Sequence, residues 1–265
     1  MHPLKSKEEI ALMREAGLMV WRAHQIAADL IKPGVTTSEI NEAVEQFLAE
    51  NKVIPLFKGV PGKVPFPAAA CISVNDEIVH GIPGRRRLRE GDIVSIDIGS
   101  RLNGWCGDAA VTHAVGKIDA RKQKLLDVTE ETLRLAIQLV SEKERWSQVA
   151  RAMQRFVENA GFSVVENLVG HGIGRDLWES PQVPNYFSPN FARNADFALK
   201  PGLVIAVEPM VNMGTKPTKL LSDHWTIATQ DGQPSAHFEH TIALTEAGPQ
   251  VLTAGPDGRA WSCLS

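Results

Sequence analysis

Cysteine is scarce in this chain, and its placement excludes two kinds of protein. The three residues, Cys71, Cys106 and Cys263, give neither a disulfide framework nor the paired spacing of a zinc motif. No apolar stretch approaches the ~18 residues of a membrane span. The first residues, Met1–Glu9, also lack the apolar core of a signal peptide. We therefore expect a cytoplasmic protein with no membrane partner.

An excess of one charge is lacking too. The net charge of -3 over 265 residues creates no overall field that would attract DNA or an anionic membrane. The basic run Gly84–Arg89 is a local exception, for which a solvated loop is the simpler interpretation and a contact with RNA or another anionic surface is the alternative. Hydrophobic residues make up 43% of the chain, which is enough for a well-buried core.

Capping signals predict where the first two helices begin. Ser6 stands three residues before Glu9, and Thr36 stands three residues before Glu39, as in capping boxes. Helices should therefore start near residues 7 and 37, and the first should end at Lys32-Pro-Gly.

Periodicity and turn residues predict the other elements. Residues 53–69 are rich in Gly and Pro and are predicted to be a loop. Apolar residues at helical spacing predict two further helices, over 119–140 and 146–160. Strands are predicted over 92–98, 105–115, 203–213, 225–229 and 237–245.

The dipeptide Asn103-Gly104 is a strong hairpin signal between two of these strands. If it forms the turn, Asp97 lies opposite Ala110 and diagonal to Asp108. Diagonal neighbours share one face of a sheet, with backbones ~7–8 Å apart. Two carboxylates would then reach the same metal ions, and without metal they would repel each other.

The order of elements repeats along the chain. Long helix, short helix and strands occur once in residues 1–116 and again in 117–252, and His80-Gly-Ile recurs as His171-Gly-Ile. We expect a single catalytic domain made of two similar halves around one site, with a short C-terminal tail, because no linker separates the halves.

Five residues on strand-like segments indicate a metal site: Asp97, Asp108, His171, Glu208 and Glu239. A charge within an apolar strand is unfavourable unless it is paired or binds a metal. Taken alone, each acid could be a helix cap or a surface charge. Together, four carboxylates and an imidazole suit Mn, Fe, Co or Zn, and they supply the charge for two divalent ions. Two ions ~3.5–4 Å apart can hold a bridging hydroxide and polarise a carbonyl.

These residues and their flanks resemble a known family. Asp97, Asp108, His171-Gly-Ile-Gly, Glu208-Pro-Met and Glu239-His-Thr are similar to the motifs of the type I methionine aminopeptidases of peptidase family M24, bacterial type. The resemblance extends from the first helix to about residue 252. It implies the α+β pita-bread fold, a pseudo-twofold antiparallel sheet with two helix pairs on its outer face. It also implies removal of the initiator methionine from peptides and nascent proteins.

The resemblance implies a role for each residue of the site. Asp97 would chelate one metal, Asp108 and Glu239 would bridge, and His171 and Glu208 would complete the second metal. Glu208 would also act as general base. His80 would contact the scissile amide, although a core or loop histidine is the alternative for it.

The chain departs from the family pattern beside His171. Trp178 stands where the family has a second active-site histidine, and Leu177 stands where it has an aromatic residue. An indole donates a hydrogen bond but cannot titrate near neutrality. If Trp178 points into the site, one donor to the substrate survives. If it points away, the lost hydrogen bond would cost ~10²–10³ in rate.

The methionine pocket and a cation site are also implied by resemblance. The pocket would be built from Phe66, Cys71, Leu177 and Trp225, for which ordinary core packing is the alternative. Methionine would fit because its unbranched thioether adapts well, and another small apolar residue would fit too. Asn75 and Ser235 match the monovalent-cation site of some family members.

Two further hypotheses about the function remain open. The first is a paralogue with altered N-terminal residue specificity. The second is a low-activity or binding protein on the same fold, against which the five retained ligands argue. No large domain precedes the first helix and no insertion fits between Glu208 and Glu239, so we expect a compact, monomeric enzyme. Its partner would be the N-terminus of a peptide or nascent protein, with the ribosome as a further candidate.

Overall fold

The computed structural model describes residues 2–258. Residues 259–265 of the predicted tail, with Cys263, lie outside the described residues. No helix in the part described is long and apolar enough to cross a bilayer. That part contains the helices α1 (Lys7–Leu30), α2 (Thr37–Glu50), α3 (Ala120–Leu139), α4 (Trp146–Asn159) and α5 (Pro189–Asn194).

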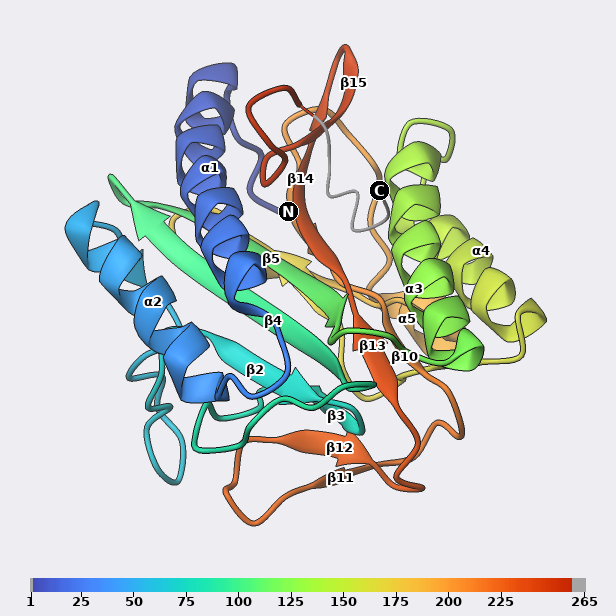
Figure 1. The fold of residues 1–265 in the computed structure, drawn as a ribbon. Helices are drawn as coiled ribbons and strands as arrows, with labels where there is room; N and C mark the ends of the chain where they lie inside the picture. Colours follow the sequence, from blue (N-terminus) through green and yellow to red (C-terminus); the bar gives the residue numbers. More distant parts are fainter. Residues whose placement is uncertain (1, 259–265) are drawn as a thin grey trace.

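One antiparallel sheet dominates the fold (Figure 1). Its main path runs β1-β4-β5-β14-β9-β7-β8, and two more strands join it, β2 at β4 and β15 at β14. Two small sheets, β13-β10-β6 and β11-β12-β3, complete the strands. The strand bounds are β1 Ile54–Pro55, β2 Cys71–Val74, β3 Glu77–Val79, β4 Ile93–Leu102, β5 Trp105–Ala114, β6 Ser163–Val164, β7 Gly170–Gly172, β8 Glu179–Val183, β9 Val204–Val207, β10 Met210–Asn212, β11 Thr218–Leu220, β12 Ile227–Thr229, β13 Ser235–His237, β14 Glu239–Thr245 and β15 Gly248–Val251.

Two helix pairs cover one face of the sheet, as Figure 1 shows. The pair α1 and α2 packs on β4 and β5 around apolar residues such as Val20, Ile40 and Ile96. The pair α3 and α4 packs over β9 and β14 around a second cluster, in which Trp146 is fully buried and donates Nε1–H to the Pro184 carbonyl at 2.8 Å. The predicted pita-bread fold is confirmed. The relation between two similar halves stays a prediction.

The predicted helix starts are confirmed at α1 and α2. Glu9 N donates to Ser6 Oγ at 3.2 Å, and Ser6 N donates to Glu9 Oε2 at 2.9 Å, which closes the capping box. The same box forms between Thr36 and Glu39. Helix α1 ends just before Lys32-Pro-Gly, because the proline ring cannot continue a helix.

The predicted hairpin is also confirmed. Asn103 and Gly104 have φ of 51° and 80°, as a two-residue turn with left-handed backbone requires. The register pairs Leu102 with Trp105 and Asp97 with Ala110. Because side chains alternate along a strand, Asp97, Ala110 and Asp108 face the same side of the sheet.

Several short elements were not predicted. Helix α5 and the strands β2, β3, β8 and β13 are too short to show a period. Residues 53–69, predicted to be a loop, contain β1, which pairs with β4 through Ile54 and Pro55. Both β1 and β8 contain proline, and both lie at a sheet edge, where a missing N–H donor is tolerated.

Candidate metal centre

Strands that are neighbours in the large sheet bring the acidic residues together. Ala110 on β5 pairs with Asp97 on β4 at one side and with Glu239 on β14 at the other. Asp108 lies two residues before Ala110 and so shares its face. Three carboxylates from three adjacent strands therefore converge on the face opposite the helices.

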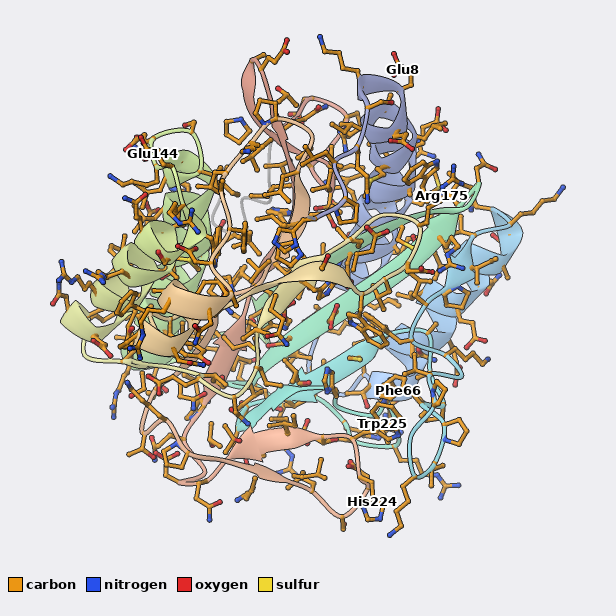
Figure 2. The ribbon with its side chains drawn as sticks, turned by 180° about the vertical axis from the view of Figure 1, so that it is seen from behind. Glu8, Phe66, Glu144, Arg175, His224 and Trp225 are labelled. Carbon is orange, nitrogen blue, oxygen red and sulfur yellow. The ribbon has the colours of Figure 1, made fainter. Side chains whose placement is uncertain are left out.

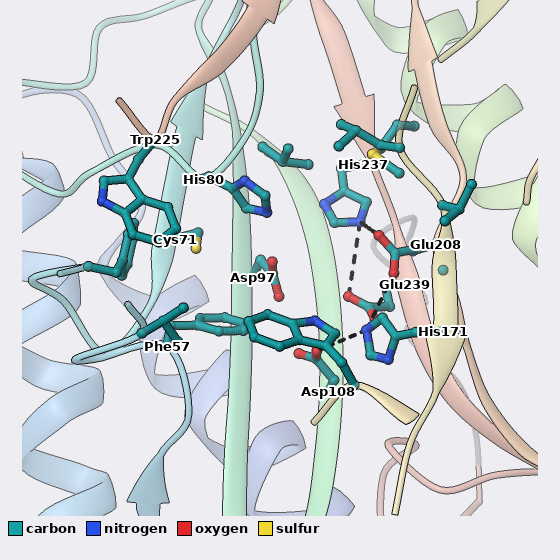
Figure 3. A pocket seen from close by; sticks show the side chains of 18 of the residues that line it. Phe57, Cys71, His80, Asp97, Asp108, His171, Glu208, Trp225, His237 and Glu239 are labelled. Carbon is teal, nitrogen blue, oxygen red and sulfur yellow. Dashed lines mark ion pairs between the residues drawn. The ribbon is translucent and has the colours of Figure 1, made fainter. Parts of the chain in front are cut away.

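The next two strands complete the cluster. Glu208 directly follows β9, and His171 lies on β7, where it pairs with Ala206 of β9. His171 Nε2 is 3.6 Å from Glu208 Oε1 and 3.9 Å from Asp108 Oδ2. Ligand atoms of Asp108, His171 and Glu239 all lie within 4.8 Å of one another. Figure 3 shows all five predicted ligands around one space.

Burial and mutual repulsion shift the protonation of these acids. Burial raises the pKa of Asp97 well above its ordinary value, and the charges of Asp108 and Glu208 raise it further. Burial and then the charge of Asp108 do the same to the pKa of Glu208. Burial first, followed by the neighbouring carboxylates, raises the pKa of Glu239. Burial also raises the pKa of Asp108 to about 7. Such a cluster can be fully ionised only if positive charge enters it.

The residues present fit a divalent metal. Asp97 Oδ1, Asp108 Oδ1 and Glu239 Oε1 are buried and have no hydrogen-bond partner. Buried carboxylate oxygens are seldom left without a partner, since desolvation is then uncompensated. Carboxylate oxygens with one imidazole nitrogen are a suitable donor set for the predicted ions.

His171 is oriented to act as a ligand. Its Nδ1 lies 2.9 Å from the Gly172 carbonyl oxygen. That contact fits a tautomer with the proton on Nδ1, which leaves the Nε2 lone pair facing Asp108 and Glu208. Burial lowers the pKa of His171, so the neutral imidazole that a metal requires is favoured.

Sequence reasoning missed His237. This residue is 2% exposed, and its Nε2 lies 3.9 Å from Glu208 Oε2 and 4.0 Å from Glu239 Oε2, without a hydrogen-bond partner. Burial, with a smaller contribution from His80, lowers the pKa of His237 to about 3, so its ring is neutral. The available signal was its position two residues before Glu239, which is the alternation of a strand.

His80 faces the same space from the loop after β3. Its backbone is left-handed, with φ of 59°, and Thr226 Oγ1 donates to its carbonyl at 3.4 Å. Burial lowers the pKa of His80. Figure 3 shows His80 and His237 on the same side of the carboxylates.

A cavity of about 410 Å³ lies over the acidic cluster. Three of the four predicted pocket residues, Phe66, Cys71 and Trp225, line it. Phe66 and Trp225 meet edge to face with ring centroids 5.3 Å apart, and both can be followed in Figure 2. Cys71 pairs with Asp97 across β2 and β4, which places the apolar wall directly beside the acids. Further apolar lining comes from Phe57, Val60 and Val79.

Leu177 is not among the residues that line this cavity. The turn between β7 and β8 directs its side chain inward, where it is buried with Ile10, Met13 and Trp105. Its neighbour Trp178 does line the cavity and is 60% exposed. Of the two residues that depart from the family pattern, Leu177 is therefore part of the core and Trp178 is exposed at the cavity.

Asn75 and Ser235, the predicted cation ligands, lie side by side. Ser235 N donates to the Asn75 carbonyl at 2.9 Å. The Asn75 side chain is engaged by Asp92 at 2.8 Å and by Ile93 N at 3.1 Å. A monovalent cation at this place stays a prediction.

A curved antiparallel sheet that presents four carboxylates and a histidine beneath an apolar cavity defines a metal-dependent hydrolase. The profile of metallopeptidase family M24 matches residues 11–246. Over 249 residues, the chain is 49% identical to methionine aminopeptidase 1 of Bacillus subtilis, covering 94% of this chain and 98% of that protein. It is 44% identical to the methionine aminopeptidase of Clostridium perfringens, with 94% and 98% covered.

Solved structures agree. The methionine aminopeptidase of Thermotoga maritima superposes with a TM-score of 0.89 at 41% identity, covering 96% of this chain and 99% of that one. A prolidase from Pyrococcus furiosus, at 21% identity and a TM-score of 0.74, shares the fold, covering 96% of this chain and 66% of that one. The chain belongs to metallopeptidase family M24 and, within it, to the type I methionine aminopeptidases.

Proposed function

We infer that this enzyme removes the N-terminal methionine from peptides and proteins. The observation that supports this best is the cluster of four acids and His171 at the floor of an apolar cavity, in a chain 49% identical to a methionine aminopeptidase. The free amine and scissile carbonyl of a peptide would lie at the acidic end. The first side chain would lie against Phe66 and Trp225.

The acidic cluster would hold two divalent ions, Mn, Fe, Co or Zn. Asp97 would chelate one ion, Asp108 and Glu239 would bridge, and His171 with Glu208 would complete the second. Bound ions would supply polarisation of the scissile carbonyl and acidification of water. The buried carboxylate oxygens without partners support this assignment.

Two side chains would move or hold protons. Glu208 stands between His171 and His237, and its raised pKa suits a group that takes a proton and passes it on. His80, neutral because burial lowers its pKa, would contact the scissile amide. We propose Glu208 as general base and His80 as a contact of the leaving nitrogen.

The first side chain would be bound by burial. Phe66, Cys71 and Trp225 provide its apolar wall, and fully burying a methionine side chain is worth ~1.5–3 kcal/mol. Trp225 Nε1 donates to the Val64 carbonyl at 2.7 Å, which holds the indole in place.

The test is hydrolysis of Met-Ala-Ser compared with Leu-, Ala- and Pro-initiated peptides, with metal-free protein reloaded with each candidate ion. Metal-dependent release of methionine alone is the expected result. Release of another residue instead would favour the alternative hypothesis of a paralogue with altered specificity. That hypothesis is considered because Trp178 replaces the histidine of the family pattern. No release with any ion would favour the binding protein. Asp108→Ala, which removes one bridging ligand, should abolish turnover.

The expectations of a monomer, a cytoplasmic location and a ribosome contact stay predictions. The four arginines of the basic run 84–89 are exposed, and two of them have partners within the chain: Arg86 pairs with Glu77 at 2.8 Å, and Arg87 donates to the Gly34 carbonyl at 2.6 Å.

A further inference from the structure

The exposed residues of the cavity lining mark where it opens. Among the lining residues, only Trp178 and Gln182 are exposed, and both belong to the β7–β8 hairpin and its turn. The others are buried or half-buried. A peptide whose first residue lies inside the cavity can therefore extend past this hairpin.

Trp178 differs from the other exposed apolar side chains. Of the large hydrophobic residues that are exposed in the described chain, it alone lines the cavity. Leu220 is equally exposed, at 60%, but lies away from it. An indole at the mouth offers a flat apolar surface and one N–H donor.

The turn that carries Trp178 is stabilised by a contact with the N-terminal segment. Lys5 Nζ lies 2.5 Å from Glu179 Oε2, with side chains only 8% and 14% exposed. The other oxygen of Glu179 accepts from Arg175 N at 2.8 Å and from Asp176 N at 3.3 Å. Lys5 N donates in turn to the Gly202 carbonyl at 2.7 Å. The Glu179 carboxylate thus stabilises the turn internally and also links it to the N-terminal segment.

The same turn is docked on the β4–β5 hairpin. Cys106 N donates to the Gly174 carbonyl at 2.8 Å, and the Arg175 guanidinium stacks 3.9 Å from the Trp105 ring centroid. At Gly174, a Cβ atom would lie 2.5 Å from Glu179 Oε1 and 2.6 Å from Lys5 Nζ, so a side chain there would have to displace the Lys5–Glu179 pair. Trp178 is exposed but stands on a fixed base, which lowers the ordering cost of binding against it.

We propose that Trp178 forms a binding surface for the peptide beyond the scissile bond, selective for apolar or aromatic side chains there, and that Lys5 is a positioning residue acting through Glu179. The inference presupposes the proposed function, since the first residue must occupy the cavity. Aromatic pairs contribute enough to favour such peptides about three- to tenfold.

The first experiment compares kcat/KM for Met-Ala-Phe and Met-Ala-Gly with the metal-loaded enzyme. The wild-type ratio should be about three to ten, carried mainly by KM. Trp178→Ala should bring it close to one, and Trp178→Phe should keep part of it. Leu220→Ala, the control of equal exposure, should keep the wild-type ratio. An unchanged ratio in Trp178→Ala overturns the binding surface. A wild type that cleaves neither peptide overturns the proposed function instead.

The second experiment tests contact without turnover. Adding Met-Ala-Phe to metal-free protein should change the tryptophan emission of the wild type, and the change should be clearly smaller in Trp178→Phe, in which Trp225 is the remaining indole of the cavity lining. The same emission change in Trp178→Phe and wild type would place the peptide elsewhere and contradict the proposal.

The third experiment tests Lys5. Lys5→Met should lower the peptide ratio, and Lys5→Arg should restore it by remaking the ion pair. Glu179→Gln, which keeps an oxygen for the turn amides but loses the charge, should give an intermediate ratio. Thermal unfolding identifies any variant that fails to fold. A folded Lys5→Met or Glu179→Gln enzyme with the wild-type ratio would remove Lys5 from the proposal.

Discussion

Asp108 is buried against three other acidic side chains, so its protonation is linked to metal binding. Its pKa of about 7 lies above that of an ordinary aspartate because of burial. The folded, metal-free protein therefore holds a proton that the unfolded chain has lost between about pH 4 and pH 7. Its free energy of unfolding should fall as the pH rises through that window.

Metal affinity should move in the opposite direction. The ion must displace protons from this cluster of acids, so affinity for Mn should rise with pH. Calorimetric titration from pH 5.5 to 8 measures the affinity, and the thermal midpoint of metal-free protein measures stability. Asp108→Asn should make both dependences shallower, while the raised pKa values of Asp97, Glu208 and Glu239 keep part of them. A metal-free protein that becomes more stable from pH 5 to 7 would contradict the assignment.

His171→Ala tests the imidazole ligand. The variant should contain less metal and lose at least about 100-fold in kcat/KM, since even outer partners of a metal site are worth 10–100-fold. Metal content per chain and peptide hydrolysis are the measurements. His224→Asn is a suitable control, because His224 is exposed and asparagine tolerates its φ of 66°. Full metal content and activity in His171→Ala would refute the ligand set.

At the scale of elements, the β4–β5 turn depends on left-handed backbone at Gly104. Gly104→Ala should cost about 1–2 kcal/mol from strain, and its new Cβ would lie 3.0 Å from Arg175 Nη1. Gly232→Ala carries similar strain, with φ of 72° and no atom within 4 Å of the new Cβ. Thermal unfolding should show a loss for both variants, larger for Gly104→Ala. Equal losses would mean that the Arg175 contact contributes nothing.

Elements with local signals could be predicted from the sequence. Residues only a few positions apart determine the capping boxes of α1 and α2 and the Asn103-Gly104 turn. The local sequence is therefore sufficient to predict them. The turn also fixed the register of Asp97 against Ala110, and with it part of the site. The five ligands could be named because their flanks resemble a family.

Elements that depend on distant partners could not be predicted. Strand β13 exists because it pairs with β10, more than twenty residues away. The strand predicted over 237–245 included His237, but its role at the site was missed. Leu177 was expected beside the substrate, but which of two neighbouring side chains faces the cavity is decided by packing against Ile10 and Met13. The orientation of Leu177 leaves no period or turn signal in the chain, and the strand alternation that aligns His237 with Glu239 does not by itself show that its ring reaches the acids.

At the scale of the whole molecule, metal should join the parts of the sheet. The proposed ligands come from β4 and β5, which pack on α1 and α2, and from β14, β9 and β7, of which β14 and β9 pack under α3 and α4. The two apolar clusters share no residue, although Ile93 of β4 and Val111 of β5 belong to the cluster under α3 and α4. An ion bound only to the folded state at 100 times its dissociation constant adds ~2.7 kcal/mol.

Removing metal should therefore lower the thermal midpoint by several degrees. Chelation followed by reloading with Mn is the measurement, and Glu239→Gln should be insensitive to both steps. A midpoint that chelation does not move, in protein shown to bind Mn, would mean that the ions bind the unfolded chain as well as the folded one, which would contradict the proposed site.

Ala110 lies fully buried between Asp97 and Glu239, with one strand neighbour on each side. Its methyl group is therefore a spacer between two ligand carboxylates. The volume of the side chain at position 110 therefore limits the space that is left for an ion between the two carboxylates. We expect that replacing Ala110 shifts the ionic radius that the site prefers, while every ligand stays in place.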